Sequence, residues 1–226
     1  MIEVKSLQKS YGPLEVLRGV SFVLRPGRVY GIVGANGAGK TTLFTCLAGL
    51  AAYNGTINPP PGQLRTRTGY LPTEPVFPSY VTGWEYLKLL CAARDLPTED
   101  FAEQNLFDLP LDRYAEHYST GMKKKLALFG LLLQGNGVYL LDEPFNGVDI
   151  QSNMLIREVI GRLRSAGKTV LLSSHVFSSL EENCDELFVL RDGRLGPPVG
   201  RDDYERLSRE LRTDSLAGRV DRLRIT

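Results

Sequence analysis

The order of apolar and polar positions along the chain divides it into three parts. In the first part, short apolar stretches rich in β-branched and aromatic residues predict strands, and a turn at Tyr11-Gly12-Pro13 separates the first two. The middle part predicts three helices with no strand between them. The last part alternates strands and helices with short links, which is typical of a mostly parallel sheet covered on both faces. The pattern therefore predicts an α/β core that carries a helical insertion.

Turn and cap residues set the bounds of these elements. A capping box starts one helix, since Glu85 follows Thr82 by three residues. The sequence Asn-Pro-Pro-Pro-Gly at residues 58–62 predicts a loop that is not helical, because proline lacks the N–H that a helix interior needs. The predicted strands are residues 2–7, 20–24, 28–33, 56–57, 68–71, 138–141, 169–173 and 186–191. The predicted helices are residues 41–49, 82–94, 98–105, 119–134, 151–164, 177–183 and 202–212.

Composition and charge narrow the class of protein. The 226 residues are 42% hydrophobic, which is enough for a sizeable core. Lys and Arg number 27 against 26 Asp and Glu, so no nucleic-acid partner is expected from bulk charge. The three cysteines form no closely spaced pair, which favours a reducing compartment. The longest apolar stretch, residues 126–133, is too short to cross a membrane, and the first residues lack the features of a signal peptide. We therefore expect a cytosolic, soluble chain.

A glycine-rich loop carries the most specific chemistry in the sequence. It follows a predicted strand, precedes a predicted helix, and matches G-x-x-x-x-G-K-[ST] at every fixed position. Backbone N–H groups of such a loop point at phosphate oxygens, the lysine reaches the β- and γ-phosphates, and the hydroxyl after it ligates magnesium. The candidate nucleotide-binding residues are Gly34, Ala35, Asn36, Gly37, Ala38, Gly39, Lys40, Thr41 and Thr42.

Polar residues at the ends of later strands complete a candidate catalytic site. Asp142 and Glu143 follow a buried strand, at the sheet edge where the phosphate loop also lies. Asp142 is suited to hold magnesium, and Glu143 to polarise the water that attacks the γ-phosphate. His175 follows the next buried strand and is a candidate γ-phosphate contact. Tyr11 either stacks on a nucleotide base or packs in its turn.

The start of the helix at residue 119 is a second candidate anion site. Ser119 begins the helix, and Gly121 leaves backbone N–H groups open near its start, although an ordinary N-cap explains the same residues. The run Lys123 to Lys125 is most simply a solvated helix face.

Together these residues resemble the ATP-binding subunit of an ABC transporter, within the P-loop NTPase superfamily. The resemblance extends from residue 2 to about residue 195, and the matched elements occur in the family's order. It implies one ABC ATPase domain over residues 1–226, with an N-terminal antiparallel β subdomain, a helical subdomain at about 74–133 and a tail at about 196–226. It also implies ATP hydrolysis with Mg²⁺, held by Thr41 and Asp142.

The resemblance further implies partners. Two subunits, of the same or a related chain, would close head to tail, with Asp149 in an inter-subunit loop. Permease subunits in the membrane would face the helical subdomain, so the chain would be peripheral on the cytoplasmic face of the cell membrane. The signature residues that would contact the partner's ATP are Ser119, Thr120, Gly121, Met122 and Lys123.

Three departures from the family pattern stand out. In the family, a glutamine that helps to bind magnesium usually follows Gly-Tyr-Leu-Pro. Here Thr73 stands in its place. The signature reads Ser-Thr-Gly-Met-Lys instead of the commoner Ser-Gly-Gly-Gln, and Asn146 replaces a small residue in the loop that leads to Asp149.

Other functions are weighed against the transporter ATPase. A GTPase needs a guanine-reading Asn-Lys-x-Asp motif, which the chain lacks. A small-molecule kinase leaves the signature and His175 unexplained. The remaining alternatives are a soluble ABC-type ATPase that acts on a macromolecular complex, and a weakly hydrolysing subunit paired with an active, different chain.

Overall fold

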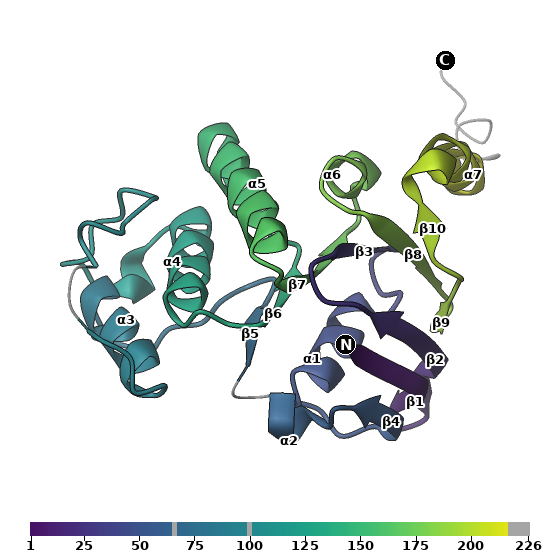
Figure 1. Cartoon of the computed structure of the whole chain (residues 1–226), viewed down its shortest axis with the longest axis horizontal. Helices are drawn as coiled ribbons and strands as arrows, with labels where there is room; N and C mark the ends of the chain where they lie inside the picture. Colours follow the sequence, from purple (N-terminus) through teal and green to yellow (C-terminus); the bar gives the residue numbers. More distant parts are fainter. Residues whose placement is uncertain (65–66, 99–100, 217–226) are drawn as a thin grey trace, which may run out of the picture.

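The computed structural model describes residues 1–64, 67–98 and 101–216, and its strands form two sheets (Figure 1). The smaller sheet is antiparallel with strand order β2-β1-β4, as predicted for the N-terminal part. Its strands are β1 (Ile2–Tyr11), β2 (Leu14–Leu24) and β4 (Asn54–Asn58). The first two strands are longer than predicted, because their pairing continues through polar positions up to the turn, where Tyr11 pairs with Leu14.

The larger sheet has the order β10-β8-β3-β7-β6-β5, with β9 paired to β8. Strands β8, β3, β7, β6 and β5 run parallel, while β9 and β10 are antiparallel to β8. Its strands are β3 (Val29–Val33), β5 (Thr68–Leu71), β6 (Val138–Asp142), β7 (Thr169–Ser174), β8 (Glu186–Arg191), β9 (Arg194–Leu195) and β10 (Val199–Gly200). Every residue of β3, β6 and β7 is buried, which explains their continuous apolar runs.

The helices agree with the predicted pattern at most positions. The capping box of α3 is present, with the Thr82 hydroxyl accepting from the Glu85 N–H and the Glu85 carboxylate accepting from the Thr82 N–H. The helices are α1 (Lys40–Leu47), α2 (Pro61–Leu64), α3 (Gly83–Ala92), α4 (Thr120–Leu133), α5 (Ile150–Ser165), α6 (Phe177–Glu181) and α7 (Tyr204–Leu216), with 3-10 turns at Ala115–His117 and Arg201–Asp203.

One predicted loop and one predicted helix are wrong. The predicted non-helical loop at residues 58–62 runs into α2, because proline is tolerated in the first turn of a helix, where its missing N–H has no partner to lose. The predicted helix at residues 98–105 lies partly outside the described residues, and residues 101–104 form turns instead of a helix. There the Asn105 side chain bonds to both the N–H and the carbonyl of Leu109, which replaces helical hydrogen bonds.

The larger sheet separates two hydrophobic cores, as the alternation of side chains along β6 shows. Val138 and Leu140 pack into the core shared with α1 and the antiparallel sheet. Tyr139 and Leu141 pack into the core shared with α3, α4 and α5. In Figure 1 the helical subdomain with α3 and α4 accordingly lies on one side of the molecule and the antiparallel sheet on the other. Among the described helices, none is long and apolar enough to span a membrane.

The first turn of α4 packs tightly on the loop that follows β6. A Cβ at Gly121 would lie 2.6 Å from the carbonyl oxygen of Gly147, so only glycine fits there without a shift of backbone. The predicted solvated face at Lys123 to Lys125 is wrong, since Lys124 is buried and the side chain of Lys125 is only 14% exposed. The Lys124 ammonium group donates hydrogen bonds to the carbonyls of Glu143 and Asn146, in the same loop.

This contact predicts opposite effects of one substitution at two helical glycines. Gly121→Ala should lower the free energy of unfolding by about 1–3 kcal/mol, because the loop must move to admit the methyl group. Gly161→Ala, in α5, meets no atom within 4 Å of the added Cβ. It should raise the free energy of unfolding by about 0.5–1 kcal/mol, because alanine has the better helix propensity. Urea denaturation of both variants checks the pair, and equal effects would contradict the packing.

Candidate functional site

The glycine-rich loop joins the central strand β3 to α1. Gly39 has φ of 105° and directly precedes α1, in a conformation that residues with a side chain rarely adopt. Lys40 is buried, and its ammonium donates to the carbonyls of Gly34 at 2.7 Å and Ala35 at 3.2 Å. The Ala38 N–H also donates to the Ala35 carbonyl, at 3.1 Å. The loop therefore curls around its own lysine, at the positive end of a helix.

The Asp142 carboxylate lies at the carboxyl end of β6 and is fully buried. Its Oδ2 accepts hydrogen bonds from Thr41 Oγ1 at 2.6 Å and from Thr73 Oγ1 at 2.8 Å. Its Oδ1 accepts from the Ser173 hydroxyl on the neighbouring strand β7. Hydroxyl donors from three other segments therefore satisfy a buried charge that would otherwise be costly.

Glu143 faces the lysine and the predicted histidine. Its Oε1 lies 3.7 Å from Lys40 Nζ, and its Oε2 lies 3.0 Å from His175 Nδ1. The backbone of Glu143 is left-handed, with φ of 51°, and its N–H donates to Ser173 Oγ at 3.0 Å. An acid, a cation and an imidazole thus meet beside the glycine-rich loop, which is a suitable arrangement for proton transfer near a polyanion.

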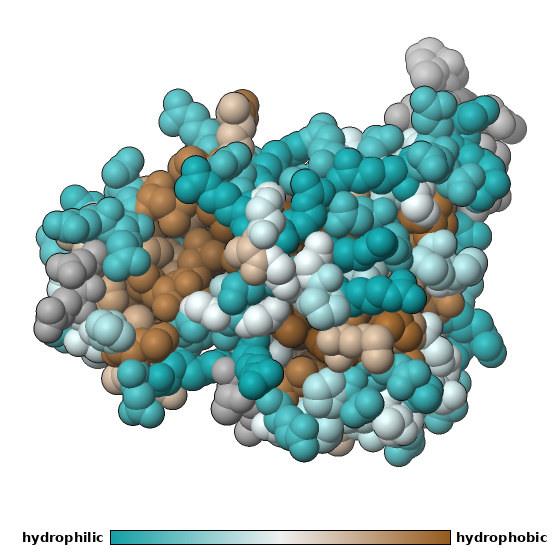
Figure 2. Space-filling model, viewed as in Figure 1, coloured by the Kyte–Doolittle hydropathy of each residue, from teal (hydrophilic) through white to brown (hydrophobic). Residues whose placement is uncertain are grey.

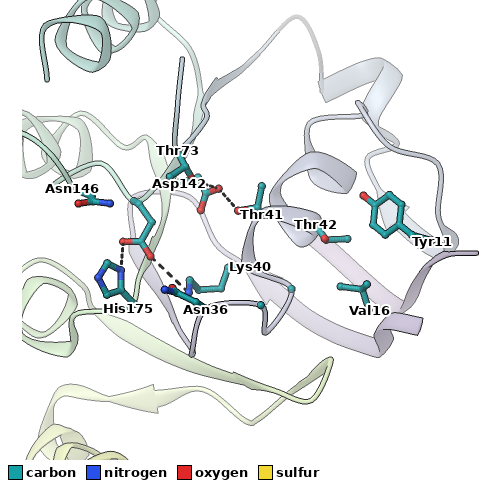
Figure 3. Close-up of a pocket in the computed structure, with 13 residues that line it drawn as sticks. Tyr11, Val16, Asn36, Lys40, Thr41, Thr42, Thr73, Asp142, Asn146 and His175 are labelled. Atoms are coloured by element: carbon teal, nitrogen blue, oxygen red, sulfur yellow. Dashed lines mark hydrogen bonds and ion pairs between the residues drawn. The ribbon is translucent and has the colours of Figure 1, made fainter. Parts of the chain in front are cut away.

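A pocket of about 510 Å³ brings most of the predicted site residues together. Tyr11 and His175 lie at opposite ends of it, and Lys40 and Asp142 lie between them (Figure 3). The Lys9 ammonium lies over one face of the Tyr11 ring, 4.7 Å from the ring centre. The predicted residues that line the pocket are Tyr11, Asn36, Gly37, Gly39, Lys40, Thr41, Thr42, Thr73, Asp142, Glu143 and His175.

The predicted signature residues lie outside this pocket. Ser119 is the N-cap of α4, and its hydroxyl accepts from the Met122 N–H at 3.2 Å. Thr120 and Lys123 line a second, smaller pocket of about 340 Å³ together with Glu74, Pro75, Val76, Phe77 and Glu116. Within one chain, α4 therefore does not contribute to the pocket of the glycine-rich loop.

Asp149, the predicted inter-subunit residue, is the N-cap of α5. It accepts from the Ser152 N–H and hydroxyl and pairs with Lys125 at 3.2 Å. The Ser152 bonds, followed by Lys125, hold the pKa of Asp149 well below its usual range.

Sequence reasoning missed three residues of the site. Val16 lines the pocket from β2, and an isolated apolar residue gave no signal for this role. Asn146 lines it three residues after Glu143, and its place in the loop behind the acid pair was the available signal. Ser173 bonds to both Asp142 and Glu143, and this follows from the parallel pairing of β6 with β7, in which Ser173 lies beside Asp142.

The residues around Asp142 fit a magnesium ion. Thr41, Thr73 and Asp142 place three side-chain oxygens together, and Mg²⁺ prefers oxygen ligands. The described residues contain no cluster of three or more His, Cys, Asp or Glu that could hold a metal unaided. This donor set is typical of Mg²⁺ that is shared with substrate phosphates, since that ion usually takes only one or two carboxylates from the protein.

Comparisons with known proteins agree with the site. The ABC transporter family model matches residues 17–146. An uncharacterized ABC transporter ATP-binding protein of Nostoc sp. is 32% identical over 79% of this chain, which spans only 58% of that relative. The ABC-type transporter ATP-binding protein EcsA of Bacillus subtilis is 31% identical, over 86% of this chain and 85% of its own length.

A solved structure has the same fold. The ATP-binding subunit of an ABC transporter superimposes with a TM-score of 0.80 at 30% identity, covering 92% of this chain and 93% of that one. Because the family model spans more than half of the chain and EcsA aligns over most of its own length, the chain belongs to the ABC transporter family.

Proposed function

We propose that the chain binds ATP with Mg²⁺, hydrolyses it to ADP and phosphate, and thereby powers a separate pair of transmembrane permease subunits. The observation that carries the proposal is the meeting of Lys40, Asp142, Glu143 and His175 in one pocket. The proposed unit is a single ATPase domain over residues 1–226, with the helical subdomain at about 74–133 and a tail at about 196–226.

The binding roles follow the order of groups along the pocket. The backbone N–H groups of the glycine-rich loop and Lys40 would bind the phosphates, and the exposed ring of Tyr11 would stack on the base. Since Lys9 covers one face of that ring, the opposite face is the one open to a base. The arrangement of lining residues in Figure 3 supports this order, with Tyr11 at one end and His175 at the other. The proposed ATP-binding residues are Tyr11, Gly34, Ala35, Asn36, Gly37, Ala38, Gly39, Lys40, Thr41 and Thr42.

Thr41 and Asp142 would hold Mg²⁺, with the Thr73 hydroxyl beside them. When bound, Mg²⁺ neutralises charge on the phosphate oxygens and orients them for attack. Glu143 would orient a water molecule and accept its proton as the water oxygen bonds to the γ-phosphorus and the bond to the β-phosphate oxygen breaks. His175 holds one oxygen of Glu143 and would also contact the γ-phosphate.

A second subunit would complete the site. Ser119, Thr120, Gly121, Met122 and Lys123 do not line the chain's own pocket, and the helix start they form would bind the phosphates held by a partner. Asp149 lies at the same surface, followed by Ile150 and Met154, which are large apolar side chains exposed to solvent. Such residues support the proposal of a head-to-tail dimer.

The helical subdomain supports the proposal of a membrane partner. Val76 is 90% exposed and Tyr80 is 77% exposed, and Val76 lines the second pocket beside Phe77. On the face drawn in Figure 2, apolar residues also gather over α4. The permease subunits would dock on this subdomain, and the chain would then be peripheral on the cytoplasmic face of the membrane. The two relatives described above are named as ATP-binding proteins of transporters, which supports this function over that of a soluble ABC-type ATPase.

Glu143→Gln tests the proposed function directly. The variant should bind Mg-ATP, lose turnover by about 10²–10⁴-fold because an amide accepts no proton, and form an ATP-dependent dimer seen by light scattering. Mg-ADP should leave it monomeric. Lys40→Ala is the matched control, since without its phosphate contact it should neither bind ATP nor dimerise. A Glu143→Gln protein that turns over ATP at the normal rate would show that Glu143 is not the base.

Two substitutions at Thr73 test whether its hydroxyl takes part in magnesium binding, which a fully active subunit would need. Thr73→Val keeps the shape and removes the hydroxyl that bonds to Asp142, so the magnesium concentration for half-maximal turnover should rise on the order of tenfold. Thr73→Gln brings in the amide that is usual in the family and should lower that concentration. Magnesium titrations of ATPase activity check both variants. An unchanged midpoint in both would show that residue 73 has no part in magnesium binding.

A further inference from the structure

A buried lysine, which does not line the pocket, contacts the backbone of Glu143. Lys124, in the second turn of α4, is only 1% exposed. Its Nζ lies 2.8 Å from the carbonyl oxygen of Glu143 and 2.8 Å from that of Asn146. Burial lowers the pKa of this lysine, while the nearby charges of Glu143 and Asp142 act in the opposite direction. A buried charge is costly unless it is fully hydrogen-bonded, and the groups that the Lys124 ammonium stabilises are these two carbonyls.

The backbone of Glu143 needs such a support. Its φ of 51° lies in the left-handed region, which is unfavourable for a residue with a side chain. Three hydrogen bonds hold the peptide groups on either side of its Cα. The N–H donates to Ser173 Oγ, and the carbonyl accepts from Lys124 Nζ and from the Asn146 N–H at 3.2 Å. In this conformation the carboxylate reaches Lys40 and His175.

The neighbouring lysines have different partners. Lys123 lines the second pocket, and Lys125 pairs with Asp149 and donates to Ser152 Oγ at 3.1 Å. Among these three consecutive lysines, only Lys124 is directed at the backbone of Glu143.

From this geometry we infer that Lys124 is a positioning residue for hydrolysis. It holds the backbone of Glu143 in the left-handed conformation that directs its carboxylate at the γ-phosphate side of the pocket. The inference rests on the proposed function and adds a residue that does not touch substrate. It predicts that Lys124 acts on turnover through the Glu143 carboxylate and has little effect on nucleotide binding, which depends on the loop around Lys40.

A double-mutant cycle on the full chain tests this inference. Lys124→Met has a side chain of similar length without a donor, and it should lower kcat by on the order of tenfold with the ATP affinity within about threefold of wild type. In the Glu143→Gln background, where no carboxylate remains to be positioned, the same substitution should change residual turnover by less than about twofold. Lys88→Met, on the exposed face of α3, removes a charge from a residue that lines neither pocket, and it should leave kcat unchanged.

Each outcome decides the matter. A loss that depends on Glu143 supports the inference. Equal losses in both backgrounds, or no loss from Lys124→Met, overturn it. If Lys124→Met does not fold, Lys124→Gln keeps one donor and serves in the same cycle, with a smaller expected loss. A wild-type chain that neither binds Mg-ATP in a calorimetric titration nor hydrolyses it overturns the proposed function and this inference together, whereas an active wild type with additive losses overturns the inference alone.

Discussion

The rest of the site depends on the hydrogen bonds that three hydroxyls donate to the buried carboxylate of Asp142. Asp142 ends β6, and hydroxyls from the start of α1, the end of β7 and the segment after β5 all donate to it. A negative charge in the interior is tolerated only when donors surround it. The requirement therefore fixes four segments of the chain at one point, and the glycine-rich loop and Glu143 take their positions from that point.

Contacts between the start of α4 and the loop after β6 connect this arrangement to the helical subdomain. Gly121 approaches Gly147 closely, Lys124 binds two carbonyls, and Lys125 binds the cap of α5. The start of α4 therefore contacts the loop after β6 at three successive places. A rotation of α4 against the sheet would have to break these contacts or carry the loop with it, so the orientation of the helical subdomain and the geometry of Glu143 are physically linked.

The sequence was informative where local rules decide the structure. The glycine-rich loop, the capping box at Thr82, the cap at Ser119 and the apolar parallel strands all follow from residue type and spacing, and they are present. Chemistry at strand ends also placed Asp142, Glu143 and His175 at one sheet edge. Long-range packing was beyond local rules. Lys124 looked like part of a solvated charged run, and only the pairing of distant segments shows that it faces carbonyls. The turns at residues 101–104 and the bonds of Asn105 to Leu109 that follow them were likewise not predicted.

The strand order has a consequence for the way the protein folds. β3 lies in the first part of the chain, yet both of its neighbours in the sheet, β7 and β8, come from the last part. The antiparallel hairpin of β1 and β2 can form as soon as it leaves the ribosome, because its partners are adjacent in sequence. The central strand must wait for residues up to 174 for its first neighbour and up to 191 for its second, and pairing over such a separation is slow because a long loop has to close first. During synthesis, β3 therefore has no partner in the parallel sheet until β7 has emerged, and the glycine-rich loop that follows β3 cannot be fixed against Asp142 and Glu143 before that point.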